Sequence, residues 1–329
     1  MAGQEELQPL FDTLAAALDG LPGVTGIDIG VRDESEPSED DLAVRVFVRD
    51  GGDPAVRSVT DSLTEQFQLP IVVQQRVFFP LSLPDTAMYR PVAGGVSVCA
   101  SRFAGAGGIP VGTMGGIART TRTLEPLMVG ISNHHVLCFD GNRSFGDEII
   151  QPQPDPGTGQ RLPDDRVGAL ASWSFPEMVY EGVADAAIFT LEKEAFASIV
   201  DIGATTGTAT ARMNTQVTKR GRTSGQTFGW VSAVGGSYKT DYSNLPPVGN
   251  PPTVERKLVN QIQVHIDFPL TVIFLESGDS GALLLESATK KIIGLLYAGG
   301  ALTAGDPIES ALATPIDVVE NELGITFTV

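Results

Sequence analysis

Residues 277–284 read Ser-Gly-Asp-Ser-Gly-Ala-Leu-Leu. Gly-Asp-Ser-Gly ahead of an apolar run is the setting that a nucleophilic serine requires. The flanking glycines allow a sharp turn and let backbone approach a substrate without a Cβ clash. The N–H groups of Gly278 and Ser280 can then converge on one point, as an oxyanion hole requires. Because a serine alone is a poor nucleophile, Ser280 needs a base and a partner for that base.

Candidates for the base are few, because the chain contains three histidines. His134 and His135 lie in the segment 132–137 (SNHHVL), where a β-rich stretch opens into a loop. His265 alternates with apolar residues in 261–267, a pattern typical of a strand face and of a structural histidine. The pair at 134–135 therefore supplies the candidate base.

The candidate partner of the base is Asp185, which directly precedes the apolar run Ala186–Phe189. Burying a carboxylate is costly unless it is hydrogen-bonded, so an acid that leads into such a strand suggests a partner. The alternative is a turn acid that caps the strand. Taken together, His135, Asp185 and Ser280 follow the chain order His…Asp…Ser, which differs from the orders of the subtilisins and the α/β-hydrolases.

Four motifs in order resemble the trypsin/chymotrypsin-fold serine proteases. More narrowly, they are similar to the intracellular trypsin-like proteases of bacteria and plants that include the plant narrow-leaf protein. The motifs are Gly-Thr-Met-Gly (112–115), Ser-Asn-His-His-Val-Leu (132–137), Lys-Arg-Gly-Arg-Thr-Ser-Gly (219–225) and Gly-Leu-Leu-Tyr-Ala-Gly (294–299). The resemblance covers about residues 88–329, and its His-Val register selects His135 over His134.

The resemblance implies a mostly β fold of two packed six-stranded antiparallel barrels, with a cleft between them. The protease domain is expected at residues 86–329, with the first barrel at about 95–200 and the second at about 201–329. A C-terminal helix is expected to begin at Thr314-Pro315 and to stop at Gly324.

The activity that the resemblance implies is that of a serine endopeptidase. Ser280 attacks a peptide carbonyl, His135 takes its proton and Asp185 orients the imidazole, with Gly278 and Ser280 as oxyanion donors. The implied specificity pocket comprises Phe274 at its base, Glu276 as a source of charge preference, and Gly299 and Gly300 at its border. An aromatic base argues against selection of Arg or Lys and favours small or aliphatic substrate side chains.

Two departures from the secreted relatives concern regulation. His134 stands where a small residue is usual, and it can compete for protons or face solvent. In secreted relatives a freed N-terminus pairs with the acid beside the serine, but here about ninety residues precede the first barrel strand. Asp279 therefore either has another partner or stays unpaired until activation. A latent protease and a catalytically silent protease-fold binding or scaffold protein both remain alternatives to a constitutive enzyme.

Residues 1–85 predict a small α+β module of order αββαβ that carries no catalytic constellation. Its first helix is indicated by a helical repeat of apolar residues: Leu7, Leu10, Phe11, Leu14 and Leu18. Its expected role is oligomerisation, partner docking or control of access to the cleft, or it merely completes the fold.

Composition favours a cytoplasmic protein. Forty acidic and 22 basic residues give a net charge of −18, which disfavours nucleic acid and anionic membrane as partners. The start lacks a signal-peptide pattern, and no apolar stretch approaches a membrane span. Cys99 and Cys138 are expected to be reduced and buried, although the resemblance allows a disulfide. We expect the substrate to be a protein or peptide. An activating protein partner and a homo-oligomer are both possible, and no cofactor or metal is expected.

Overall fold

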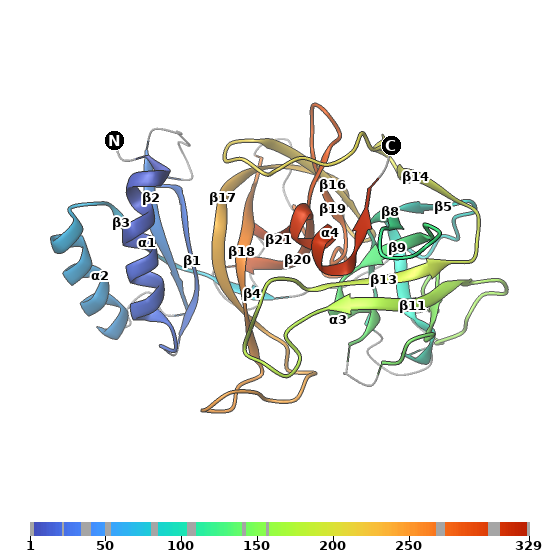
Figure 1. Cartoon of the computed structure of the whole chain (residues 1–329), viewed down its shortest axis with the longest axis horizontal. Helices are drawn as coiled ribbons and strands as arrows, with labels where there is room; N and C mark the ends of the chain where they lie inside the picture. The colour runs from blue at the N-terminus through green and yellow to red at the C-terminus, as the bar shows by residue number, and fades with distance from the viewer. Residues whose placement is uncertain are drawn as a thin grey trace.

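The structure is a computed structural model of the whole chain (Figure 1). It describes residues 3–21, 23–33, 41–49, 54–79, 85–103, 110–139, 143–155, 158–267, 274–301 and 310–327. Strands predominate in these ranges, as predicted, and none of their helices is long and apolar enough to cross a membrane. Figure 1 shows the N-terminal module in blue at one end, a gold-to-red barrel in the middle and the green first barrel at the other end.

The second barrel is closed and six-stranded, as predicted. Hydrogen bonding runs β16-β17-β18-β21-β20-β19 and returns to β16, with every pair antiparallel. The motif at 219–225 forms its first hairpin, in which Gly225 has a φ of +65° that favours glycine. The strands are β16 (Gln216–Gly221), β17 (Gly225–Asp241), β18 (Glu255–Ile266), β19 (Leu283–Glu286), β20 (Ile292–Ala301) and β21 (Ser310–Pro315).

The first barrel departs in detail from the predicted six strands. Its sheet has eight segments in the order β22-β8-β9-β13-β11-β10-β6-β7. The extra members arise because a short break separates β7 from β8, and because the end of the chain returns to pair β22 with β8. The strands are β6 (Val96–Ala100), β7 (Gly112–Met114), β8 (Gly116–Thr120), β9 (Met128–Ser132), β10 (Glu148–Ile150), β11 (Arg166–Ser174), β13 (Ala186–Leu191) and β22 (Ile325–Thr326).

Smaller elements accompany the two barrels. A three-stranded sheet joins β15 (Gly203–Ala204), β14 (Ala195–Ile199) and β5 (Val92–Gly94), and β12 (Glu181–Gly182) pairs with β18. A short 3-10 helix, η1 (Ser101–Phe103), follows β6. Cys99 and Cys138 are free and buried, which agrees with the expected thiols.

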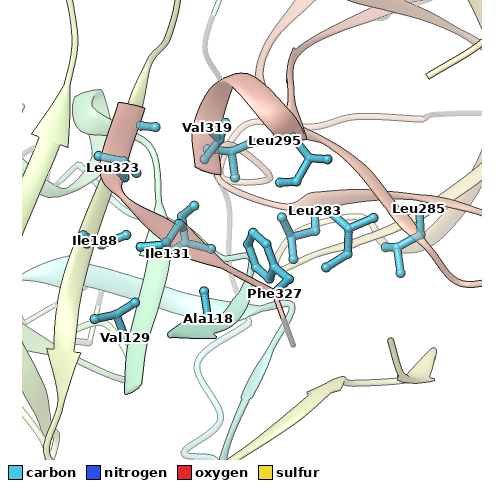
Figure 2. Close-up of a cluster of buried hydrophobic side chains, with 14 of the residues drawn as sticks. Ala118, Val129, Ile131, Ile188, Leu283, Leu285, Leu295, Val319, Leu323 and Phe327 are labelled. Atoms are coloured by element: carbon cyan, nitrogen blue, oxygen red, sulfur yellow. The ribbon is translucent and has the colours of Figure 1, made fainter. Parts of the chain in front are cut away.

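A shared apolar core joins the two barrels (Figure 2). Helix α4 (Ile316–Leu323) packs over it and stops at Gly324, whose φ is +61°, as the sequence predicted. Residues from both barrels, from α4 and from the C-terminal segment meet in this core: Ala118, Val129, Ile131, Ile188, Leu283, Leu285, Leu295, Val319, Leu323 and Phe327. Each fully buried aliphatic side chain of this kind contributes about 1.5–3 kcal/mol. The core fixes one barrel against the other, and so fixes the two sides of any site between them.

The N-terminal module follows the predicted order, except that its last predicted strand is divided at Arg76. Its helices cover one face of its sheet, and the apolar positions of α1 are buried. The elements are α1 (Gln4–Leu18), β1 (Val24–Val31), β2 (Leu42–Val48), α2 (Pro54–Phe67), β3 (Ile71–Gln75) and β4 (Val77–Phe79).

The module continues the sheet of the second barrel. Strand β1 pairs antiparallel with the distal half of β17, for example Gly26 with Tyr238. Beneath this pairing Asp28 and Arg45 form a fully buried ion pair with an Oδ1–Nε distance of 2.7 Å. Tyr238 donates a hydrogen bond to Asp28, and Arg45 donates one to Gln263 of β18. The proposed domain boundary near residue 85 remains a prediction. Residues on its two sides are joined by the backbone hydrogen bonds of β1 with β17 and by side-chain hydrogen bonds such as that of Tyr238 to Asp28.

Candidate active site

Each of the three predicted catalytic residues lies next to the end of a strand. His135 lies on α3 (His134–Leu137), a short helix directly after β9 where the sequence predicted a loop. Asp185 immediately precedes β13 and Ser280 precedes β19, as predicted. Because β9 pairs antiparallel with β13, with Ser132 opposite Ala187, the start of α3 and the start of β13 lie at the same end of the sheet.

This pairing brings His135 and Asp185 into direct contact. His135 Nδ1 lies 2.6 Å from Asp185 Oδ2, and the His135 backbone N–H donates to Asp185 Oδ1 at 3.1 Å. The Asn133 side chain donates to the Asp185 carbonyl at 2.7 Å, which holds the backbone of the acid. Since a carboxylate only accepts, Nδ1 carries the proton and Nε2 is left as the basic nitrogen.

A residue that the sequence did not single out completes the surroundings of the acid. Tyr242, just after β17, donates its hydroxyl to Asp185 Oδ2 at 2.8 Å, and both side chains are buried. Burial raises the pKa of Asp185, but the charge and hydrogen bond of His135, together with the Tyr242 hydroxyl, outweigh it and hold that pKa below its usual value. Asp185 therefore stays ionised, which is the state that orients an imidazole.

Strand β7 lies between the histidine and the serine. A Cβ on Gly112 would lie 2.4 Å from Val136 Cγ2 and 2.7 Å from the Ser280 carbonyl oxygen. The Thr113 N–H donates to the Ser280 carbonyl at 2.7 Å. Gly112 therefore fills the space between the Val136 side chain and the Ser280 carbonyl. Any side chain at this position would clash with one of them, which explains the glycine that begins the 112–115 motif.

The Ser280 hydroxyl is directed to β20. Its Oγ donates to the Tyr297 carbonyl at 3.4 Å, and among the described residues no hydrogen bond joins it to His135. Ser280 is 4% exposed and the His135 side chain 11%. Hydrogen bonds between catalytic groups are often long in the absence of substrate, so this geometry is compatible with a nucleophile–base pair.

The loop before Ser280 has its carbonyl groups held in fixed directions. Thr223 Oγ1 donates to the Ser277 carbonyl at 2.6 Å, and Thr113 Oγ1 donates to the Gly278 carbonyl at 2.7 Å. The Asp279 carbonyl accepts the Ala282 N–H at 2.9 Å. In a trans peptide the N–H points opposite to the C=O, so the Gly278 and Ser280 N–H groups are fixed too. Neither donates to any residue in the described ranges, which leaves both available for an anion.

Asp279 has a partner, which answers one question left open by the sequence. Lys219 Nζ of β16 lies 2.6 Å from Asp279 Oδ2, and both side chains are fully buried. The Asp279 carboxylate also accepts hydrogen bonds from Ser224 Oγ and from the N–H groups of Thr223, Ser224 and Glu276.

Burial shifts both pKa values in this pair. Burial lowers the pKa of Lys219, while the charge of Asp279 opposes that shift. Burial raises the pKa of Asp279, but Lys219 and the surrounding donors outweigh it and hold that pKa below its usual value. The motif at 219–225 that marked the resemblance thus supplies the cation for the acid beside Ser280. Lys219 lies two residues after buried Val217 and so on the same face of β16, a position from which its burial could have been inferred.

His134 does not face solvent, so that expectation was wrong. Its ring is fully buried, stacks on Phe175 with centroids 4.5 Å apart, and its Nε2 contacts Glu177. Burial lowers the pKa of His134 to about 3. A histidine that remains neutral at ordinary pH does not compete with His135 for protons.

Two of the predicted pocket residues precede Ser280 in the sequence and two follow it. Phe274 is fully buried in the core of the second barrel, with Lys219 Nζ 5.7 Å from its ring centroid. Glu276 is partly exposed. Gly299 and Gly300 lie on β20 and pair with β4. Their role in specificity remains a prediction. No group of three or more His, Cys, Asp or Glu side chains in the described part of the chain could hold a metal.

Comparisons with known proteins give a likeness at the level of fold. No protein-family model and no curated protein matches the sequence. Solved structures that it resembles include a glutamic acid-specific serine protease reported to use a histidine triad in substrate binding, with 17% identity, a TM-score of 0.46, and coverage of 71% of this chain and 99% of that one. Thermobifida fusca protease A (15% identity) and Nocardiopsis protease (16%) each show a TM-score of 0.46 and coverage of 71% of this chain and 97% of theirs.

Proposed function

We propose that this chain is a serine endopeptidase that cleaves peptide bonds through an acyl-enzyme. The observation that carries the proposal is the 2.6 Å contact of His135 Nδ1 with ionised Asp185, one strand away from Ser280. A buried carboxylate that fixes the tautomer of a histidine is the arrangement that activates a serine. Within that class, its motifs resemble those of the intracellular trypsin-like proteases of bacteria and plants.

The reaction follows from the atoms in place. Ser280 Oγ attacks the substrate carbonyl carbon while His135 Nε2 takes its proton, and Asp185 stabilises the imidazolium that results. The negative charge that develops on the carbonyl oxygen is bound by the Gly278 and Ser280 N–H groups, each worth about 3–4 kcal/mol in comparable sites. His135 then protonates the leaving amine, and water repeats the sequence to release the acyl group from Ser280.

The substrate class, the cellular location and the regulation of this activity are also proposals. A net charge of −18 favours protein or peptide substrates with a basic or neutral surface over nucleic acid or membrane. The few cysteines support a cytoplasmic location. Activation by a protein partner and self-association through residues 1–85 remain open roles for the N-terminal module.

A second candidate is a catalytically silent binding or scaffold protein. The hydrogen bond of Ser280 Oγ to the Tyr297 carbonyl, in place of one to His135, favours it. Latency is a third state, but an unpaired Asp279 cannot be its cause because Lys219 neutralises that acid.

Labelling by a fluorophosphonate probe tests the proposal. Intact protein should be labelled at Ser280, and Ser280→Ala and His135→Ala should both abolish labelling. If Ser280 is labelled, hydrolysis of a peptide library by protein that has not been treated with the probe would then define the pocket. Absence of labelling in folded intact protein, with or without residues 1–85, would favour the silent protein.

A further inference from the structure

Strand β20 has one edge that is shared between two strands. Along one side it pairs with β21 from Gly294 to Gly300. Along the other side it pairs with β19 only up to Leu295. Beyond that point the same side is taken by β4, with Gly299 opposite Phe79, Gly300 opposite Phe78 and Ala301 opposite Val77.

This edge runs past the nucleophile. The Tyr297 carbonyl accepts the Ser280 hydroxyl, and the Leu296 carbonyl accepts the Gly281 N–H at 2.8 Å. Gly299 is two residues further on, which is about 7 Å along an extended strand. Figure 1 shows β4 leaving the module and running in among the strands of the second barrel. An extended piece of this chain therefore pairs with β20 from two residues beyond the one that contacts Ser280.

An open strand edge is a template for an extended peptide, because its unpaired N–H and C=O groups pair with any backbone laid along it. A peptide whose carbonyl is to reach Ser280 must bind near this position in an extended conformation. Two strands cannot pair with the same edge of β20 at once.

We propose that β4 is a built-in occupant of the peptide-docking edge of β20, and that an extended peptide binds there only by displacing it. The inference rests on the proposed function in one respect only, namely that the displacing peptide is the substrate. Val-Phe-Phe is a β-forming apolar sequence, which indicates the kind of peptide that the edge accepts.

Both flanks of β4 are anchored, which makes it a strong competitor. Before it, the Arg76 N–H donates to the Val48 carbonyl at 2.8 Å, and the Arg76 carbonyl accepts Thr25 Oγ1 at 2.6 Å. After it, Asp85 forms an ion pair with Arg220 at 3.1 Å. A tethered strand acts at high effective concentration, so release requires loosening an anchor or cutting the chain between them.

The test replaces Val77-Phe78-Phe79 by Gly-Ser-Gly in a Ser280→Ala background, which prevents cleavage. The matched control is Phe196→Ser, an exposed aromatic residue on β14 of the first barrel. The probe is a fluorescent Arg-Val-Phe-Phe peptide, with binding measured by polarisation. We expect at least tenfold tighter binding to the replacement variant than to the parent or the control. Amide exchange at residues 299–301 should be faster in the free variant and slow again with peptide.

Equal peptide affinity in parent and variant, or unchanged exchange at 299–301, would overturn the inference even if Ser280 is labelled normally. Conversely, failure of labelling in wild-type protein and in the replacement variant with Ser280 intact would remove the protease proposal without affecting the binding result. If the replacement does not fold, Phe78→Pro and Phe79→Pro are compared. Adjacent N–H groups of a strand point to opposite sides, so only one of the two removes a donor to β20, and only that one should raise peptide affinity.

Discussion

Lys219 Nζ lies 2.6 Å from Asp279 Oδ2, and neither side chain is exposed to solvent. The pair ties the β16–β17 hairpin to the loop that leads into Ser280. Since Asp279 also accepts three backbone N–H groups, the loop is fixed by a lysine from within the same barrel and needs no freed N-terminus.

Replacing this lysine should damage both stability and site. Lys219→Met leaves the Asp279 carboxylate buried without its cation, which should cost about 3–5 kcal/mol of unfolding free energy. Fluorophosphonate labelling should fall with it, because the loop that carries Gly278 loses its anchor. Lys193→Met, whose pair with Asp164 is largely exposed, is the control and should change little. Urea unfolding that gave the same midpoint for both variants would contradict this account.

Two buried tyrosines should respond differently to loss of the hydroxyl. Tyr242→Phe removes the 2.8 Å hydrogen bond to Asp185, and a hydrogen bond to a charged group is worth about 1.5–3 kcal/mol. We expect kcat to fall about tenfold, since 1.4 kcal/mol corresponds to a factor of ten. Tyr297 has a buried hydroxyl without a partner among the described residues, so Tyr297→Phe should be neutral or stabilising. Steady-state kinetics between pH 4 and 9 would separate the two, and identical profiles would count against a role for Tyr242.

His134 should make the fold sensitive to acid. Its pKa is lowered to about 3 in the folded protein, so as pH falls below about 6.5 the unfolded chain binds a proton before the folded one does. The stability present above pH 6.5 is therefore lost progressively toward pH 3, by up to about 1.4 kcal/mol per pH unit. His134→Gln keeps a donor for Glu177 but cannot titrate, and its unfolding free energy should fall less between pH 6 and 4. Parallel curves for the two proteins would exclude His134 as the cause.

The ion pair under the module should couple it to the second barrel. Arg45→Met leaves Asp28 buried without its cation, with an expected loss of about 3–5 kcal/mol. Because β1 and β17 share hydrogen bonds, we expect one cooperative transition at a lower midpoint. Arg49→Met is the control, since its pair with Glu255 is partly exposed. A calorimetric trace that split into two transitions, with the second unshifted, would show that module and barrel unfold independently.

Local patterns in the sequence were sufficient for much of this architecture. Apolar periodicity located α1, Gly324 marked the end of α4, and the acid before an apolar run located Asp185 at the start of β13. The order of His135, Asp185 and Ser280 indicated the reaction, although their catalytic roles remain predictions.

The same local patterns could not predict which residues far apart in the sequence come into contact. Tyr242 reaches Asp185 across 57 residues, and nothing in its neighbours indicates a partner. The contact of Lys219 with Asp279 depends on how β16 pairs with β19. The pairing of β4 with β20 joins segments more than 200 residues apart, and no local propensity encodes such a match.

The sheet that runs from β3 through β17 has a consequence for synthesis on the ribosome. The module is made first, but its β1 edge waits for β17, about two hundred residues later. Ser280 follows another forty residues on, after His135 and Asp185 have emerged. Ser280 is thus the last of the three to leave the ribosome, and β20 follows it, when β4 has already been made. On the proposed function and the proposed role of β4, the site is completed only when the strand that would cover it is present.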